Sequence, residues 1–257
     1  MVKLALAPAL IGCVSLLQRR WGPSIGGLFG GLPLTVGPAL FVLALENGPQ
    51  FAAVAATNAV QALVAVAAFS AAYAFSAVRL RMDWIRSTGF ALAVYLVVMW
   101  LVTFLPQSLI LAVVAAGAAQ WSAYHLMPVG GGNAASETQP PWWDLLLRMA
   151  AAVLLVWSVS ALAETVGARV SGLLTPFPIP ALILGAFTHK HDGSSAAAGL
   201  LRSLVMGLFS REAFCAVAAA ALPKLGVAGA FGLAAVCTVA TQVCLWRFWH
   251  SRERADL

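Results

Sequence analysis

The sequence predicts an all-α polytopic membrane protein, and two observations support this prediction. Of the 257 residues, 61% are hydrophobic and only 9% are charged, with a mean hydropathy of +0.90, whereas about a quarter of the residues of a soluble protein are charged. The apolar residues also form runs of about 20 residues, which is the length that crosses a bilayer as a helix. We therefore expect the chain to be organised as a series of membrane-spanning helices.

Nine runs of this kind follow one another along the chain. They are residues 2–18, 25–45, 51–76, 87–105, 107–127, 143–163, 168–188, 194–222 and 225–248. A removable signal peptide is the alternative for the first run, but no small-residue cleavage site precedes "RRWGPS", so we expect a first helix. The eighth run contains "SREAF", which leaves open whether it is one helix or two.

The basic residues fall unevenly on the two sides of these nine runs. Ten lie on one side, namely Arg19, Arg20, Arg79, Arg81, Arg86, Arg148, Lys190, Arg247, Arg252 and Arg254, while the other side has only Lys3, Arg169 and Lys224. Loops rich in lysine and arginine remain in the cytoplasm. This predicts a periplasmic N-terminus and a cytoplasmic C-terminus. The net charge of +6 is then a topology signal, and we expect no nucleic-acid partner.

The chain contains an internal repeat with a shift of 145 residues. "WGPSIGGLFGGLPLTVG" (residues 21–37) aligns with "VGARVSGLLTPFPIPAL" (residues 166–182), and Gly48 then aligns with Gly193 without a gap. The repeat unit has four spans, so spans one to four correspond to spans six to nine. Because this shift of five spans is odd, the second copy is expected to enter the membrane from the opposite face, as an inverted repeat.

The repeat predicts three parts of the chain. Residues 1–105 form a first four-helix repeat, residues 106–142 form a linking helix with a cytoplasmic Gly/Pro-rich linker, and residues 143–257 form the second, inverted repeat. The linker reads "MPVGGGNAASETQPP", a composition typical of flexible joins.

The second half also has a family resemblance. Residues 168–214 read "ARVSGLLTPFPIPALILGAFTHKHDGSSAAAGLLRSLVMGLFSREAF", with an FP-containing broken segment, a short polar turn and a long helix. This stretch resembles the GlpM family of small four-helix bacterial inner-membrane proteins. The first half resembles it only through the repeat, with "GGLPLTVGP" in place of FP. The resemblance implies a duplicated, fused GlpM-like protein of the bacterial inner (plasma) membrane, with a link to exopolysaccharide (alginate) production.

Two predicted spans contain helix breakers at positions that the repeat relates. These residues are Pro33, Gly37 and Pro38 in the second span and Pro176, Pro178 and Pro180 in the seventh. Secondary transporters built from inverted repeats use paired broken helices at the bilayer midplane to bind substrate. The alternative is that the breaks are kinks for close packing, helped by the small residues of "GGLFGG".

Polar residues inside the apolar runs complete the candidate binding site. The predicted substrate-binding residues are Pro33, Thr35, Asn58, Gln61, Thr175, Pro178, Arg202, Arg211 and Glu212. A charge near mid-bilayer costs roughly 2.5–3.5 kcal/mol, so Arg211 and Glu212 are expected to face the interior and a partner. Adjacent residues on a helix point about 100° apart, so each needs its own partner. For Arg211 we expect a carboxylate, carbonyls of the broken seventh span, or a bound anion.

Three alternatives remain open among these polar residues. Arg202 could instead extend to the cytoplasmic surface. Arg211 and Glu212 could be solvated in a loop if "FSREAF" splits the eighth span. His189, His191 and Asp192 follow the seventh span, where a solvated turn is the favoured interpretation and a proton relay is the alternative.

The sequence favours a carrier over an enzyme. It contains no HExxH motif, no GxSxG motif and no paired carboxylates in the spans, so we expect no catalytic residue. The four cysteines lack metal-ligand spacing, and no cofactor or metal is expected. The leading hypothesis is a secondary transporter or flippase of a small polar or anionic solute or envelope precursor, and the alternative is a non-transporting scaffold subunit of an exopolysaccharide or envelope biosynthesis complex. The expected partners are the lipid bilayer and a small anionic molecule, and a homodimer is left open.

Overall fold

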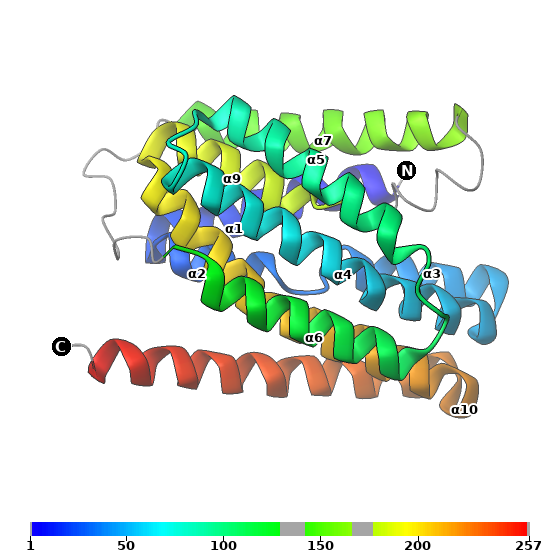
Figure 1. The fold of residues 1–257 in the computed structure, drawn as a ribbon. Coiled ribbons are helices and arrows are strands. Elements are labelled where there is room, and N and C mark those ends of the chain that lie inside the picture. Colours follow the sequence, from blue (N-terminus) through cyan, green and yellow to red (C-terminus); the bar gives the residue numbers. More distant parts are fainter. Residues whose placement is uncertain (1, 129–141, 166–176, 256–257) are drawn as a thin grey trace.

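The computed structural model describes residues 2–128, 142–165 and 177–255, and every regular element in these ranges is a helix (Figure 1). The helices are α1 (Val2–Trp21), α2 (Pro23–Gly30), α3 (Val36–Asn47), α4 (Pro49–Val78), α5 (Trp84–Val102), α6 (Leu109–Leu126), α7 (Trp142–Thr165), α9 (Ile179–Asp192) and α10 (Ser194–Ala255). The long helices run side by side as a bundle (Figure 1). The predicted all-α class is confirmed for the described residues.

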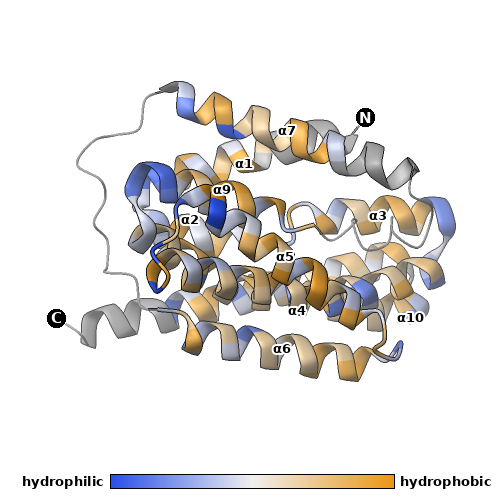
Figure 2. Cartoon of the chain, turned by 45° about the horizontal axis from the view of Figure 1, so that its top comes forward, coloured by the Kyte–Doolittle hydropathy of each residue, from blue (hydrophilic) through white to orange (hydrophobic). Residues whose placement is uncertain are grey.

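Four of the described helices are long and apolar enough to cross a membrane, namely α4, α5, α6 and the stretch Ser194–Arg247 of α10. Hydrophobic residues cover the flanks of the bundle, and hydrophilic residues concentrate at its two ends (Figure 2). This distribution is typical of a helical membrane protein, because lipid surrounds the flanks and water meets the ends. The number of crossings, predicted as nine, stays a prediction.

The helix breaks lie where the prolines and glycines predict them. The second predicted span is divided into α2 and α3, with residues 31–35 non-helical between them. The eighth span is one continuous helix through "SREAF", so the alternative of a loop at Arg211 and Glu212 is wrong. Gly226, with φ 68° and ψ −176°, separates this helix from the segment 227–255. The first part of the seventh predicted span, including Thr175 and Pro176, lies outside the described residues.

The core lies between α4 and the first half of α10. Helices α5 and α6 pack on α4, while α2 and α9 pack on α10. Alanines fill most of the core positions on α4, and large side chains such as Phe69, Leu201 and Leu204 close the remaining space. The two central helices can therefore approach closely, and the surrounding helices complete the burial of their faces.

Helix α2 contacts α10 through glycine backbone. A Cβ atom built on Gly27 would lie 2.2 Å from the Leu200 carbonyl oxygen, and one built on Gly31 would lie 2.3 Å from the Gly207 carbonyl carbon. A Cβ on Gly207 would lie 2.2 Å from the Leu28 carbonyl oxygen. No side chain fits between the two backbones, as in the small-residue contacts of membrane helices.

Two glycines with the same backbone conformation each join a short helix to a long one. Gly48 has φ 89° and ψ 165° between α3 and α4, and Gly193 has φ 89° and ψ 172° between α9 and α10. L side chains rarely adopt this positive-φ region, and glycine adopts it without strain. The sharp reversal between short and long helix is thus encoded by one residue in each half of the chain.

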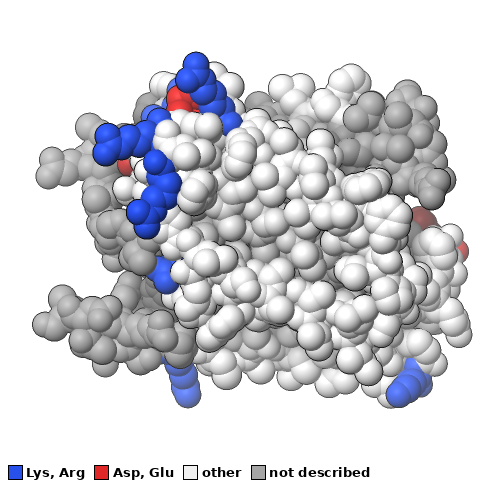
Figure 3. All heavy atoms as spheres, in the orientation of Figure 1, with Lys and Arg blue, Asp and Glu red and all other residues white. Residues whose placement is uncertain are grey.

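The charged side chains are concentrated at one end of the bundle. Figure 3 shows most of the Lys and Arg side chains at the end where α1 meets α2 and α9 meets α10, with few at the opposite end. The exposed basic residues include Arg20, Arg79, Arg81, Arg86 and Lys190. Among the described residues that this view shows, the basic side chains are therefore asymmetric in the sense expected from the sequence.

Candidate functional site

The site begins at the break after α2. A helix leaves its last carbonyl groups without intrahelical partners, and Pro33 together with the glycines before it prevents the helix from continuing. The chain resumes helical structure at Val36, and the Gly37 N–H donates to the Pro33 carbonyl at 2.8 Å. The carbonyls of Gly30, Gly31 and Leu32 therefore point into the protein interior and need donors from elsewhere.

Arg211 supplies those donors from the middle of α10. Its Nε donates to the Gly31 carbonyl at 3.1 Å, and its Nη2 donates to the carbonyls of Gly30 at 3.2 Å and Leu32 at 3.1 Å. The residue is only 9% exposed. The C-terminal carbonyls of a helix carry partial negative charge and therefore attract a cation. A carbonyl cluster, one of the three expected partners, thus offsets the burial of this charge.

The source of that carbonyl cluster differs from the expectation. The sequence pointed to the broken seventh span, but the carbonyls belong to the second. The physical reason is helix packing: Gly27, Gly31 and Gly207 bring the end of α2 into backbone contact with α10. Arg211 lies one turn beyond Gly207 on α10 and meets that end directly.

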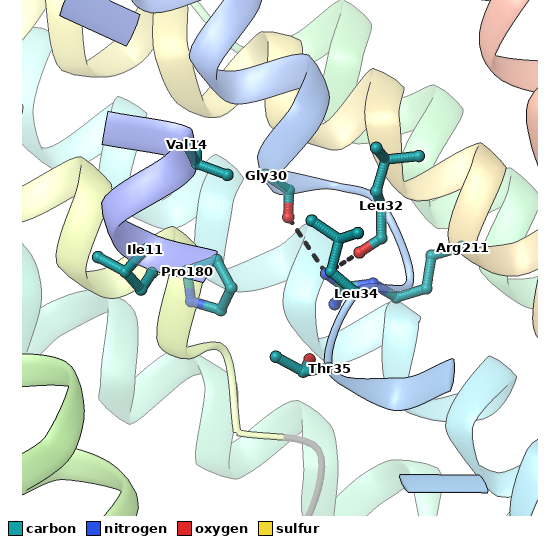
Figure 4. Close-up of a pocket in the computed structure, with 8 residues that line it drawn as sticks. All are labelled: Ile11, Val14, Gly30, Leu32, Leu34, Thr35, Pro180 and Arg211. Carbon is teal, nitrogen blue, oxygen red and sulfur yellow. Dashed lines mark hydrogen bonds between the residues drawn. The ribbon is translucent and has the colours of Figure 1, made fainter. Parts of the chain in front are cut away.

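A small hollow adjoins the guanidinium (Figure 4). Its cavity volume is about 20 Å³, little more than one water molecule needs. It is lined by Ile11, Val14, Gly30, Leu32, Leu34, Thr35, Pro180 and Arg211. Figure 4 shows the guanidinium reaching between Gly30, Leu32 and Thr35. Two predicted site residues, Thr35 and Arg211, are thus brought together, and both breaks contribute, because Pro180 belongs to the start of α9.

The hollow offers hydrogen-bonding groups that no described residue uses. The Thr35 side chain makes no capping hydrogen bond at the start of α3. Within the described residues, Nη1 of Arg211 donates to no acceptor and no carboxylate pairs with the guanidinium. A guanidinium has five N–H donors, so the two on Nη1 remain for a ligand. Arg211 and Thr35 are side chains of the kind that binds an anion, but the hollow as it stands has room for about one water molecule.

The remaining residues of the predicted first-half site lie elsewhere. Pro33 is buried within the α2–α3 connection, between Leu32 and Leu34, and does not itself line the hollow. Gln61 is buried on α4 and its Nε2 donates to the Pro106 carbonyl at 2.9 Å, in the loop between α5 and α6. Asn58 is exposed on the same helix. The structure therefore separates these two α4 residues from Arg211.

The predicted second-half residues are also distributed over different contacts. Pro178 is buried as the N-cap of α9, and Thr175 lies outside the described residues. Arg202 is half-buried, donates from Nε to the Tyr124 carbonyl at 3.1 Å and lies over the Tyr124 ring at 4.2 Å. It therefore fixes the end of α6 on α10 and does not line the hollow.

Glu212 faces away from Arg211, toward α6. Its Oε2 accepts a hydrogen bond of 2.6 Å from Nε2 of Gln120. Both side chains are buried, Gln120 completely. The expectation that the adjacent charges have separate partners is confirmed. Gln120 itself was missed, although a glutamine inside the apolar run 107–127 is a signal that could have identified it.

A second polar cluster, the Asp144 network, consists of Arg19, Asp144, Arg148 and His191. Asp144 Oδ2 lies 2.9 Å from Arg148 Nε and 3.1 Å from Arg19 Nη2, and Asp144 Oδ1 lies 3.1 Å from His191 Nε2. Asp144 is fully buried. The network ties α1, α7 and α9 together at the basic end of the bundle. The spacing of Asp144 and Arg148, four residues apart on one helix, could have predicted part of it.

The last turn of α9 is less exposed than expected. Sequence analysis favoured a solvated turn for His189, His191 and Asp192, but all three are only partly exposed. His189 Nδ1 lies 3.3 Å from Tyr73 Oη in a hydrogen bond. Burial lowers the pKa of His189 from its ordinary value, although the nearby charge of Asp83 acts in the opposite direction. Burial also raises the pKa of Asp192, against the opposing effect of Arg148 and His191. These shifts follow from desolvation.

Comparison of the chain with protein-family models, with curated proteins and with solved structures finds no match. The class that the structure defines is a helical membrane protein. A buried arginine on its central helix, α10, bonds to the end of another helix, α2, where the chain breaks its helical structure. Within the part of the chain that the structure describes, no three histidine, cysteine, aspartate or glutamate side chains are grouped to hold a metal ion.

Proposed function

We propose that this protein is a secondary transporter or flippase that moves a small anionic solute or envelope precursor across the bacterial inner membrane. The observation that carries the proposal is Arg211, a buried arginine with two unused N–H donors beside a hollow at a helix break. Its charge is met by carbonyl dipoles and by no carboxylate within the described residues. A bound anion would neutralise the charge of Arg211, because a guanidinium fork binds carboxylate or phosphate with paired hydrogen bonds.

The proposed mechanism is alternating access between two inverted four-helix repeats. Three features support the repeat: the alignment at a shift of 145 residues, the similar backbone angles of Gly48 and Gly193, and the order of a short helix followed by a long one around each glycine. In this scheme the hollow is the closed form of the site. With about 20 Å³ it cannot hold a phosphate ion, so movement of α2 and α9 relative to α10 has to enlarge it.

The orientation and location follow from the same proposal. With the basic end of the bundle in the cytoplasm, the N-terminus is periplasmic and the C-terminus cytoplasmic. The partners are then the lipid bilayer and the anion. The resemblance to the GlpM family supports an inner-membrane location and an envelope-related substrate.

A second candidate is a non-transporting scaffold of an exopolysaccharide or envelope biosynthesis complex. The observation that favours it is the dry backbone contact of α2 with α10, where glycines leave no room for water. Such a contact is typical of rigid helix packing. In this case the hollow is a packing defect and Arg211 serves only to cap α2.

The test is anion uptake into proteoliposomes containing the full chain, with radiolabelled inorganic phosphate and glucuronate as the probes. We expect Arg211→Leu to abolish uptake and Arg211→Lys to reduce it, because lysine keeps the charge without the planar fork. Thr35→Val removes one hydroxyl and keeps the shape, so a partial loss is expected. Full activity of Arg211→Leu would make the residue structural and would favour the scaffold.

The matched control is Arg202→Leu. It removes an arginine from the same helix that also bonds to a backbone carbonyl, but this arginine does not line the hollow. Uptake by Arg202→Leu is expected to stay near the unmodified level at equal amounts of folded protein. Equal loss in both variants would show that any missing charge on α10 impairs the fold and would count against an anion site at Arg211.

A further inference from the structure

Glu212 lies in the apolar interior between α10 and α6, and it is only 6% exposed. Its polar partner within the described residues is a neutral amide, the Nε2 of Gln120, at 2.6 Å from Oε2. An ionised carboxylate placed in such surroundings without a cation is costly, whereas the neutral acid is not. The position therefore favours a carboxyl group that carries its proton.

The charged and titratable groups around Glu212 offer it no counter-charge within the described residues. On α10 the neighbours are Arg211, whose bonds go to the end of α2, and Cys215, which is buried. Helix α6 contributes Gln120, and the titratable residues Tyr124 and His125 lie one turn or more further along the same helix. The titratable side chain of α4 is Tyr73, and its hydroxyl forms a hydrogen bond with His189. None of these groups forms an ion pair with the carboxylate.

The amide of Gln120 supports the same conclusion independently. Its Oε1 is buried and has no hydrogen-bond donor. An amide presents one donor end and one acceptor end, and a carboxyl group matches both only when it is protonated. With an ionised Glu212 the amide oxygen stays unpaired among the described residues, and a buried acceptor without a donor is unfavourable. A protonated Glu212 is a donor that an ionised Glu212 is not, and it is the residue already bonded to this amide.

We propose that Glu212 and Gln120 form a proton-binding site, and that proton release from Glu212 is coupled to movement of the anion. The coupling rests on the proposed function, whereas the site itself does not. In the step, the O–H bond of Glu212 breaks, its electron pair stays on the carboxylate, and the proton passes to water. Gly117 of α6 faces the carboxyl group, since a Cβ built there would lie in van der Waals contact with Oε1, at 3.6 Å.

The site is tested by infrared difference spectroscopy on the full chain reconstituted in lipid, titrated from about pH 5 to about pH 9. We expect a carboxylic acid carbonyl band at neutral pH that disappears on alkalinisation and is absent from Glu212→Gln. In Gln120→Leu the band should remain but shift to the frequency of an acid without a hydrogen bond. A spectrum of Glu212→Gln identical to that of the unmodified protein over this range would overturn the proton site.

The coupling is tested separately in proteoliposomes with inorganic phosphate. With a proton gradient, the unmodified protein should accumulate phosphate against its concentration gradient, while Glu212→Gln should exchange phosphate without accumulating it. If Glu212→Gln also accumulates phosphate, the coupling is wrong although the carrier stands. If the unmodified protein moves no phosphate, the proposed function loses its support for this anion, and the infrared result still decides the proton site.

Discussion

Replacing Gly207 by alanine tests whether α2 and α10 really touch through their backbones. A Cβ at this position would lie 2.2 Å from the Leu28 carbonyl oxygen and 3.1 Å from the Gly31 Cα. Ordinary van der Waals contact begins near 3.4 Å, so the backbone of α2 has to retreat by about 1 Å. Overpacking of this kind costs about 1–3 kcal/mol, and the movement also strains the hydrogen bonds that Arg211 makes to the end of α2.

Gly199 provides the matched control on the same helix. A Cβ there meets no atom within 4 Å, so Gly199→Ala gains helix propensity and should stabilise the protein by up to about 1 kcal/mol. The two substitutions are chemically identical and share the gain in helix propensity, so they should differ in free energy of unfolding by about 1–3 kcal/mol, the cost of overpacking at Gly207. The measurement is unfolding in mixed micelles with increasing denaturing detergent, followed by tryptophan fluorescence. Equal midpoints for Gly207→Ala and Gly199→Ala would refute the close contact.

Three further predictions concern charges and orientation. Asp144→Asn leaves buried cations without their carboxylate and should destabilise the fold by about 3–5 kcal/mol. The control is Asp83→Asn, which removes an exposed ion pair with an N–O distance of 3.9 Å. It should change the free energy of unfolding by less than about 1 kcal/mol in the same unfolding assay. Burial lowers the pKa of His189 from its ordinary 6.5, so the unfolded chain binds more protons at this residue and the stability should fall as the pH drops below that value. In His189→Gln the unfolding midpoint should depend less on pH. An unchanged slope of midpoint against pH would exclude this residue as the cause. A reporter fused after Leu257 should be active only in the cytoplasm, and a signal confined to the periplasm would reverse the topology.

Much of the fold follows from sequence because membrane helices are encoded locally. Apolar run lengths located the helices to within a few residues, and Pro33 with its preceding glycines located the break between α2 and α3. The continuous helix through Arg211 could not be decided in the same way. Two adjacent charges are compatible with either a loop or a buried helix, and the choice depends on whether partners exist in three dimensions.

The site was less predictable because its contacts join distant segments. Arg211 is separated by about 180 residues from the carbonyls that it binds, and backbone carbonyls leave no mark in a sequence. Their polar side chains inside an apolar run drew attention to Asn58 and Gln61, but helix rotation exposes the first and turns the second toward the Pro106 loop. A polar residue in an apolar run signals a contact, and only packing decides with which group.

One turn of α10 carries both the anion-binding and the proton-binding group of the proposed carrier. Arg211 points to the end of α2, and Glu212, about 100° further around the helix, points to Gln120 on α6. If α10 rotates or tilts so that the guanidinium leaves the carbonyls of α2, the carboxyl group cannot keep its 2.6 Å bond to Gln120 unless α6 follows. Opening the anion site would therefore also change the surroundings of Glu212, which gives a mechanical reason for coupling without a direct contact between the two charges.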